Sequence, residues 1–214
     1  MANTTNPDSV LYQLRSLMPR RPLLKHEALR IAELQANHLL RMSGVDQPGT
    51  PSEIISGLPF IRVDYRRDLP VSGSAQWLRP RWLVLLKADE PLVRQRFSLM
   101  HEAKHILDHE TARYGSSDPD DVEAQYRAEL IADYFAASIL MPRRLVKRLW
   151  GNGVQHPRQL AAAFGVSDVA MRYRLQELGL TEPYVRRRHF GVERSKAIYW
   201  RERMPHLELL GSAV

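Results

Sequence analysis

Apolar positions recur at helical spacing between Pro22 and Met42, and this pattern predicts the clearest helix of the N-terminal region. A proline suits the first turn of a helix, and the glycines and prolines of residues 44–51 end the pattern. The repeating positions are Leu23, Leu24, Ala28, Ile31, Leu34, Ala36, Leu39 and Leu40. We expect a helix with a packing role here, preceded by loosely helical residues 1–20.

The spacing changes between Phe60 and Lys87, where short apolar and aromatic runs alternate with turn residues. The predicted strands are Phe60–Tyr65, Gln76–Leu78 and Trp82–Leu86, with turns at residues 72–74 and 79–81. We expect these strands to form a small three-stranded antiparallel sheet. A mostly helical chain with such a sheet falls in the α+β class.

A further helix is predicted after Glu90-Pro91, and its two faces differ in character. On a helical wheel its apolar side chains fall within an arc of about 140°. His101, Glu102 and His105 lie on the opposite arc. The helix can therefore bury one side against the sheet and turn the other side to a cleft. The apolar arc consists of Leu92, Val93, Leu99, Met100, Ala103, Ile106 and Leu107.

The polar arc contains the sequence His-Glu-Ala-Lys-His at residues 101–105. Two histidines four residues apart lie one turn apart on one helix face, so both imidazoles can reach a single Zn²⁺. Glu102 lies about 100° round the helix, close enough to take a proton from water at the metal. The HExxH pattern is typical of zinc peptidases. The alternative is a chance match on a helix.

A catalytic zinc needs a third protein ligand, and the sequence offers one on the next predicted helix, Val122–Leu140. A histidine six residues beyond the motif is excluded, because Thr111 stands there. Glu129 and Asp133 share a face of the next helix, so Glu129 can bind the metal and Asp133 can accept the free N–H of a zinc histidine. The alternative is a solvated carboxylate pair. His109, about 12 Å along the helix axis from His101, is a poorer ligand and is interpreted as a rim residue or a helix-end cation.

The C-terminal third carries the whole basic excess of the chain, whose net charge is +7. Residues 1–141 have 17 Lys and Arg against 18 Asp and Glu, whereas residues 142–214 have 14 against 6. Residues 156–180 follow a basic helix and read as helix, turn and helix. Arg172 and Arg174 on the second helix are candidate nucleic-acid contacts. The alternatives for this region are packing on the rest of the chain, contact with a protein substrate, or a solvated basic face. For residues 184–204 we expect either a wing-like hairpin or a tail.

Composition narrows the class of protein further. With 214 residues, 44% hydrophobic and 26% charged, the chain can form one full-sized domain or two small ones, and it has no cysteine to bind a metal or form a disulfide. No apolar run of membrane-spanning length and no secretory signal is found, so we expect a cytoplasmic protein. We divide the chain into an N-terminal helical segment, 1–55, a metallopeptidase core, 56–141, and a basic helix-turn-helix-like region, 142–214.

Two separated stretches, Arg96–His109 and Ala132–Pro142, resemble the ImmA/IrrE family of metallo-endopeptidases, over roughly residues 60–180. The resemblance implies a zincin-like domain in which His101, His105 and Glu129 bind Zn²⁺ and Glu102 is the general base. Asp133 stands where the family often has Asn. Lys104 replaces a small residue, often Gly, and is expected near the rim, where it could alter substrate preference.

The function expected from these residues is zinc-dependent cleavage of a peptide bond in a protein. The resemblance implies a narrow substrate, a helix-turn-helix repressor cut to derepress stress, phage or mobile-element genes. An edge strand of the sheet is expected to pair with the substrate backbone. Candidate donors to the oxyanion are Tyr126, Tyr134, His109 and Arg172. The rival is a DNA-binding regulator that uses the zinc fold as a structural or sensing module.

Overall fold

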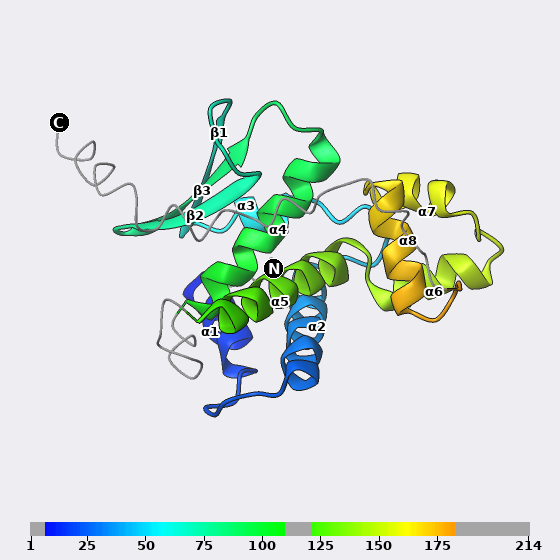
Figure 1. Cartoon of the computed structure of the whole chain (residues 1–214), viewed down its shortest axis with the longest axis horizontal. Helices are drawn as coiled ribbons and strands as arrows, with labels where there is room; N and C mark the ends of the chain where they lie inside the picture. Colours follow the sequence, from blue (N-terminus) through cyan, green and yellow to red (C-terminus); the bar gives the residue numbers. More distant parts are fainter. Residues whose placement is uncertain (1–6, 110–120, 183–214) are drawn as a thin grey trace, which may run out of the picture.

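The computed structural model describes residues 7–109 and 121–182, in which a small sheet lies at one side of a group of helices (Figure 1). In chain order the elements are α1 Pro7–Ser16, α2 Lys25–Met42, α3 Glu53–Ser56, β1 Ile61–Arg66, β2 Gly73–Leu78, β3 Arg81–Lys87, α4 Leu92–Asp108, α5 Val122–Leu140, α6 Arg143–Gly151, α7 Pro157–Phe164 and α8 Asp168–Glu177. The expected α+β class is confirmed. None of the helices within these ranges is long and apolar enough to cross a membrane. The segment 184–204 lies outside the described residues.

The sheet has the strand order β1-β3-β2 and is mixed. Our expectation of an antiparallel sheet is wrong for one pair of strands, because β3 is antiparallel to β2 but parallel to β1. The most apolar strand takes the centre, where Trp82, Val84 and Leu86 are buried. β3 thus inserts between β1 and β2, which leaves β2 as an edge strand.

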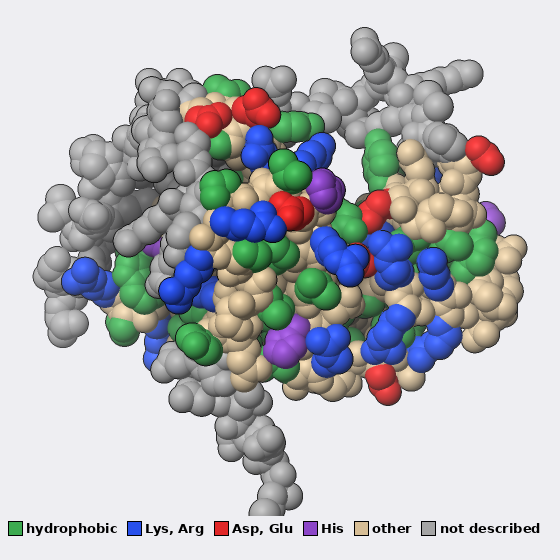
Figure 2. All heavy atoms as spheres, turned by 90° about the horizontal axis from the view of Figure 1, so that it is seen from below, with side chains coloured by type: hydrophobic (Ala, Val, Ile, Leu, Met, Phe, Trp, Pro, Cys, Tyr) green, Lys and Arg blue, Asp and Glu red, His purple; other side chains and the backbone are tan. Residues whose placement is uncertain are grey.

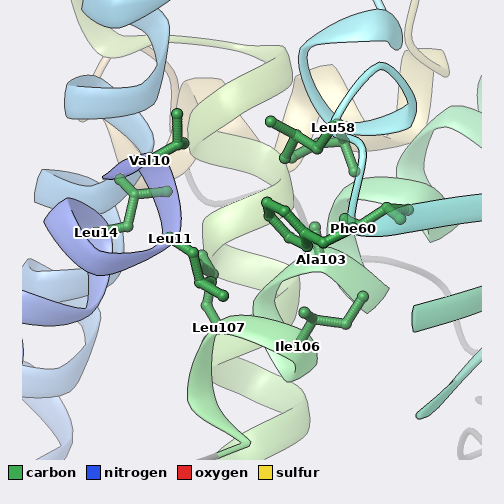
Figure 3. A pocket seen from close by; sticks show the side chains of 10 residues that line it. Val10, Leu11, Leu14, Leu58, Phe60, Ala103, Ile106 and Leu107 are labelled. Carbon is green, nitrogen blue, oxygen red and sulfur yellow. The ribbon is translucent and has the colours of Figure 1, made fainter. Parts of the chain in front are cut away.

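Helix α4 packs across β2 and β3. The apolar arc predicted for this helix is buried from Leu99 to Leu107, whereas Leu92 in the first turn is 75% exposed. Behind α4 lies an apolar pocket, lined by Ala103, Ile106 and Leu107 together with side chains of α1 and residues 55–61 (Figure 3). Because its lining offers no polar partner for a water, this side of α4 serves packing alone.

Helix α5 packs against both α2 and α4 and crosses them in Figure 1. Ala132 and Ala136 are fully buried, and such small side chains allow helix backbones to approach closely. A single cluster of buried residues runs from Val10 in α1 to Leu178 after α8. The division of the chain at residues 55/56 and 141/142 stays a prediction.

Helices α7 and α8 form the expected helix, turn and helix. Gly165 ends α7 with φ +61°, a left-handed conformation that suits glycine. The Ser167 side chain accepts a hydrogen bond from the backbone N–H of Ala170 and so caps α8. The core-facing side of the pair is apolar, with Phe164 and Met171 fully buried.

Two basic side chains anchor the C-terminal half of α4. Arg15 of α1 donates hydrogen bonds to the carbonyl oxygens of Ile106 and Leu107, which belong to the last turn of α4. Lys104 is 1% exposed and donates to Gln35 Oε1 at 2.8 Å and Asp108 Oδ1 at 2.6 Å. The expectation that Lys104 lies near the rim is therefore wrong. Its ammonium is buried because α2 supplies a partner that lies far away in the sequence.

We predict that Asp108→Ala lowers the free energy of unfolding by about 2–4 kcal/mol, because it removes the anion that compensates the buried Lys104 charge. Lys104→Met, which removes the charge and keeps the side-chain length, should cost about 1 kcal/mol or less. Urea unfolding of both variants measures the two changes. Equal losses in the two variants would contradict a compensated buried charge.

Candidate metal centre

The packing of α4 against α5 brings together three side chains that can bind a metal ion: His101, His105 and Glu129. The two Nε2 atoms of the histidines are 3.0 Å apart. Glu129 Oε2 lies 3.3 Å from His101 Nε2, and Glu129 Oε1 lies 3.3 Å from His105 Nε2. One possible ligand atom from each residue lies within 4.8 Å of the others.

These three residues fit a catalytic zinc. Two histidines and one glutamate are a common ligand set for such an ion, with a fourth position left open. Nitrogen and oxygen ligands lie about 2.0–2.1 Å from Zn²⁺, so ligands at the corners of a tetrahedron are about 3.3–3.4 Å apart. The two Nε2 atoms are 3.0 Å apart, and each lies 3.3 Å from a different oxygen of Glu129, so each of these separations is close to that spacing. Binding of zinc through a single Glu129 oxygen would require a shift of the carboxylate.

Asp133 orients the first histidine. Its Oδ1 lies 2.8 Å from His101 Nδ1, on the side of the ring opposite to the ligand atom. A carboxylate at this position holds the N–H on Nδ1 and leaves Nε2 for the metal. Asp133 lies one helical turn beyond Glu129, so a single helix supplies both a ligand and the residue that orients another ligand.

Without a metal, this arrangement attracts protons. Burial lowers the pKa of His101, but hydrogen bonds to Asp133 and Glu129 outweigh it and raise the pKa to about 10. Burial raises the pKa of Glu129, but hydrogen bonds from the two histidines hold that pKa well below its usual range. The site therefore favours a positive charge between Glu129 and Asp133, and a divalent cation can replace the proton.

Glu102 is 5% exposed and lies between α4 and β2. A Cβ atom added to Gly73 would lie 3.3 Å from Glu102 Oε1 and 3.3 Å from Ser98 Cβ, so the strand backbone passes directly over Glu102. The residue pattern at 72–74 predicts a turn, so this role of Gly73 was not expected from the sequence. A glycine between strand-forming residues was the available signal, because it marks a close approach of the backbone.

β2 presents a hydrogen-bonding edge beside Glu102. The backbone N–H of Lys87 on β3 donates to the carbonyl of Ser72, so the opposed residues Ser72 and Lys87 form a hydrogen-bonded pair. In an antiparallel ladder every second residue of β2 after Ser72 then also hydrogen-bonds to β3. The backbone N–H and C=O groups of Gly73, Ala75 and Trp77 therefore point to the open edge of β2 in the described part of the chain. An extended peptide can pair with these groups.

The other residues expected at the site lie elsewhere or bind within the fold. Tyr134 donates a hydrogen bond to Glu33 on α2 at 3.4 Å. Arg172 pairs with Asp168 at 2.8 Å on the same helix. Tyr126 is 65% exposed on α5, and His109 packs edge-on against Trp82.

The structure places Arg174 differently from our expectation of a nucleic-acid contact. Its side chain is 1% exposed, donates to the carbonyl of Met141 and pairs with Glu177 at 2.8 Å. It therefore joins α8 to the end of α5 and cannot reach a ligand at the surface.

Basic side chains of α6 also bind inward. Arg143 pairs with Glu33 at 2.9 Å, and Arg144 and Arg148 donate to the backbone carbonyls of Val45 and Asp46. Figure 2 shows Lys and Arg side chains spread across one face of the molecule, with acidic side chains among them. Part of the C-terminal charge excess is thus used to hold α6 to the end of α2.

Comparisons with known proteins agree with this geometry. A family model described as the IrrE N-terminal-like domain, Peptidase_M78, matches residues 62–176. A solved structure of a Mycobacterium tuberculosis transcriptional regulator superposes with a TM-score of 0.55 at 16% identity, which shows a shared fold. That match covers 85% of this chain but 54% of the regulator, so the chain spans about half the length of that protein. No curated protein sequence matches the chain.

We predict that Asp133→Ala weakens zinc binding by about 10–100-fold, because His101 loses the partner that sets its tautomer. Glu129→Ala, which removes a ligand, should weaken it further. Glu123→Ala is the matched control, since Glu123 lies on the same helix with its side chain 84% exposed and should leave the affinity unchanged. Competition with a chromophoric chelator measures all three, and an unchanged affinity in Glu129→Ala would refute the ligand assignment.

Zinc binding should release about one proton at pH 7, because His101 is protonated in the metal-free site and must be neutral to bind. A raised pKa means that the proton stays bound until the pH approaches about 10, so zinc affinity should increase about tenfold per unit between about pH 6 and 9. Calorimetry in buffers of different ionisation enthalpy counts the protons. His38→Gln, at the contact of α1 and α2, is the control and should leave the count unchanged.

Proposed function

We propose that this chain, which belongs to the IrrE N-terminal-like domain family of M78 peptidases, is a cytoplasmic zinc-dependent endopeptidase. The observation that carries the proposal is the convergence of His101, His105 and Glu129 beside the buried Glu102. A structural zinc site would use four protein ligands, whereas three ligands next to a carboxylate leave a position for chemistry.

Bound zinc would supply a Lewis acid that polarises the scissile carbonyl and makes water more acidic. Glu102 takes a proton from the attacking water and later passes it to the amine that leaves. Burial under Gly73 suits this role, because it keeps the Glu102 carboxylate close to a substrate that pairs with the strand. Asp133 keeps the Nε2 atom of His101 available as a ligand while the proton moves elsewhere.

The open edge of β2 supports a peptide as the substrate class. The backbone N–H and C=O groups of every second residue from Gly73 to Trp77 point outward. An extended peptide could hydrogen-bond to them and so add a fourth strand to the sheet. The strand passes over Glu102, so a paired segment would carry one of its peptide bonds across the general base. The edge strand left open by sequence analysis is thus assigned to β2 in this proposal.

The protein substrate we propose is a helix-turn-helix transcriptional repressor, and cleavage would derepress stress, phage or mobile-element genes. Support for this part comes from the family resemblance of the two motifs. Contacts through residues 142–182 would then select the protein substrate, since α7 and α8 still present exposed side chains such as Val169 and Tyr173.

A DNA-binding regulator is the second candidate. It is favoured by the shared fold with a transcriptional regulator of Mycobacterium tuberculosis, and by the basic excess of residues 142–214. Against it stand the burial of Arg174, the pairing of Arg172 with Asp168, and the contacts of α6 within the chain. Arg174 is thus withdrawn from the surface, and the exposed arginines of α6 already bind Glu33 and backbone carbonyls instead of phosphate.

The deciding experiment is co-expression of the chain with a repressor encoded beside its gene. Wild type should cleave the repressor, and Glu102→Gln should slow cleavage by about 10²–10⁴-fold because it removes the general base. Zinc content of the purified variant should be unchanged, since Glu102 is not a ligand. Arg172→Ala, a surface control on α8, should retain cleavage. If Glu102→Gln keeps full biological activity and Arg172→Ala loses it together with salt-dependent DNA binding, the regulator is the correct function.

A further inference from the structure

An exposed tryptophan continues the line of the open strand away from Glu102. Residues alternate in direction along a strand, so Gly73, Ala75 and Trp77 share one face of β2. Gly73 places this face against Ser98 and Glu102 of α4. Trp77 therefore lies on the face that borders the candidate active site, farther along the same edge.

Trp77 stands on a rigid aromatic support. Its ring centroid lies 5.4 Å from that of Trp82, its opposed partner on β3, at an interplanar angle of 54°. The Trp82 ring in turn packs edge-on against His109, with centroids 4.8 Å apart. Trp82 is 6% exposed, whereas Trp77 is 46% exposed. The strand edge is thus connected to the end of the motif helix by two ring contacts that share the buried Trp82, and one indole surface is left open.

The spacing sets where a bound peptide would meet this indole. Gly73 and Trp77 are about 13 Å apart along the strand, at about 3.3 Å per residue. His109 lies one turn beyond His105, about 9 Å along the axis from the midpoint of the two ligand histidines. At the rise of a paired strand these distances of about 9 and 13 Å correspond to about three and four residues, so the side chain about three residues from the scissile bond is the first that would reach Trp77.

We propose that Trp77, supported by Trp82 and His109, is a specificity-determining residue that binds an aromatic or large aliphatic side chain of the substrate about three residues from the cut bond. The inference rests on the proposed peptidase function. A rigid ring needs little ordering when a ligand binds, and its open face offers apolar and aromatic contact without a buried charge to desolvate. Selection by such a surface would add to the sequence-independent pairing with the strand.

The test uses the zinc-loaded full-length chain and hydroxamate probes, which bind a catalytic metal directly. Acetohydroxamate reports the metal centre alone. Two series of short peptides, with the hydroxamate at one end or the other, carry either Phe or Gly at the third residue. The variants are Trp77→Ala, Trp77→Phe and the matched control Leu78→Ala, because Leu78 is 43% exposed on the opposite face of the same strand.

The expected result is that wild type binds the Phe probe of one series about tenfold tighter than the Gly probe. Trp77→Ala should bind both probes alike while keeping its zinc and its affinity for acetohydroxamate. Trp77→Phe and Leu78→Ala should keep most of the preference. Trp77→Gln, which keeps a long side chain against Trp82 but has no ring, should also bind both probes alike, so the proposal is tested even if Trp77→Ala does not fold.

The outcomes separate the two levels of the proposal. Binding of acetohydroxamate without a Phe preference in either series overturns the role of Trp77 and leaves the peptidase function standing. A preference that persists in Trp77→Ala or in Trp77→Gln overturns it as well. Failure of acetohydroxamate to bind any zinc-loaded variant overturns the peptidase function and the subsite together.

Discussion

The contact between α4 and α5 is the constraint on which the rest of the site depends. His101 and His105 can meet on one helix by spacing alone, but the third ligand must come from a second helix held at a fixed rotation. Ala132 and Ala136 on α5 are buried small residues, which allow neighbouring helices to approach closely. A rotation of either helix by one residue, about 100°, would carry the ligands apart.

The same constraint explains why the opposite sides of α4 differ so strongly. The side of α4 that faces away from the metal centre is apolar and includes the pocket beside Ile106. The side chains that line this pocket therefore offer no polar group that could bind the metal ligands instead. Polar contacts instead fix its end, where Arg15 binds the last carbonyls and Lys104 joins α2 through Gln35. These contacts hold α4 along its axis, while the apolar surface fixes its distance from the sheet.

The sequence was sufficient where the determining contacts are local and insufficient where they are not. Helical spacing placed His101, His105 and Glu129 on faces that the structure brings together, because a period of 3.6 residues depends on nothing outside the helix. It could not predict that β3 inserts beside β1 in parallel, since strand order is decided by partners distant in the chain. Lys104 and Arg174 were expected at the surface for the same reason: their burial depends on partners 69 and 33 residues away.

The contacts that C-terminal cations make within the chain change how the basic C-terminal third should be understood. A count of charges suggests a surface for an acidic partner, but Arg143 pairs with Glu33, and Arg144 donates to a carbonyl beyond α2. Such contacts make the charge a structural means of joining α6 and α8 to the helices that carry Glu129. The open backbone of β2 and the exposed ring of Trp77 are different, because they lie beside the general base and their groups face outward. Discrimination between substrates is therefore better sought along this strand than in the net charge of the C-terminal region.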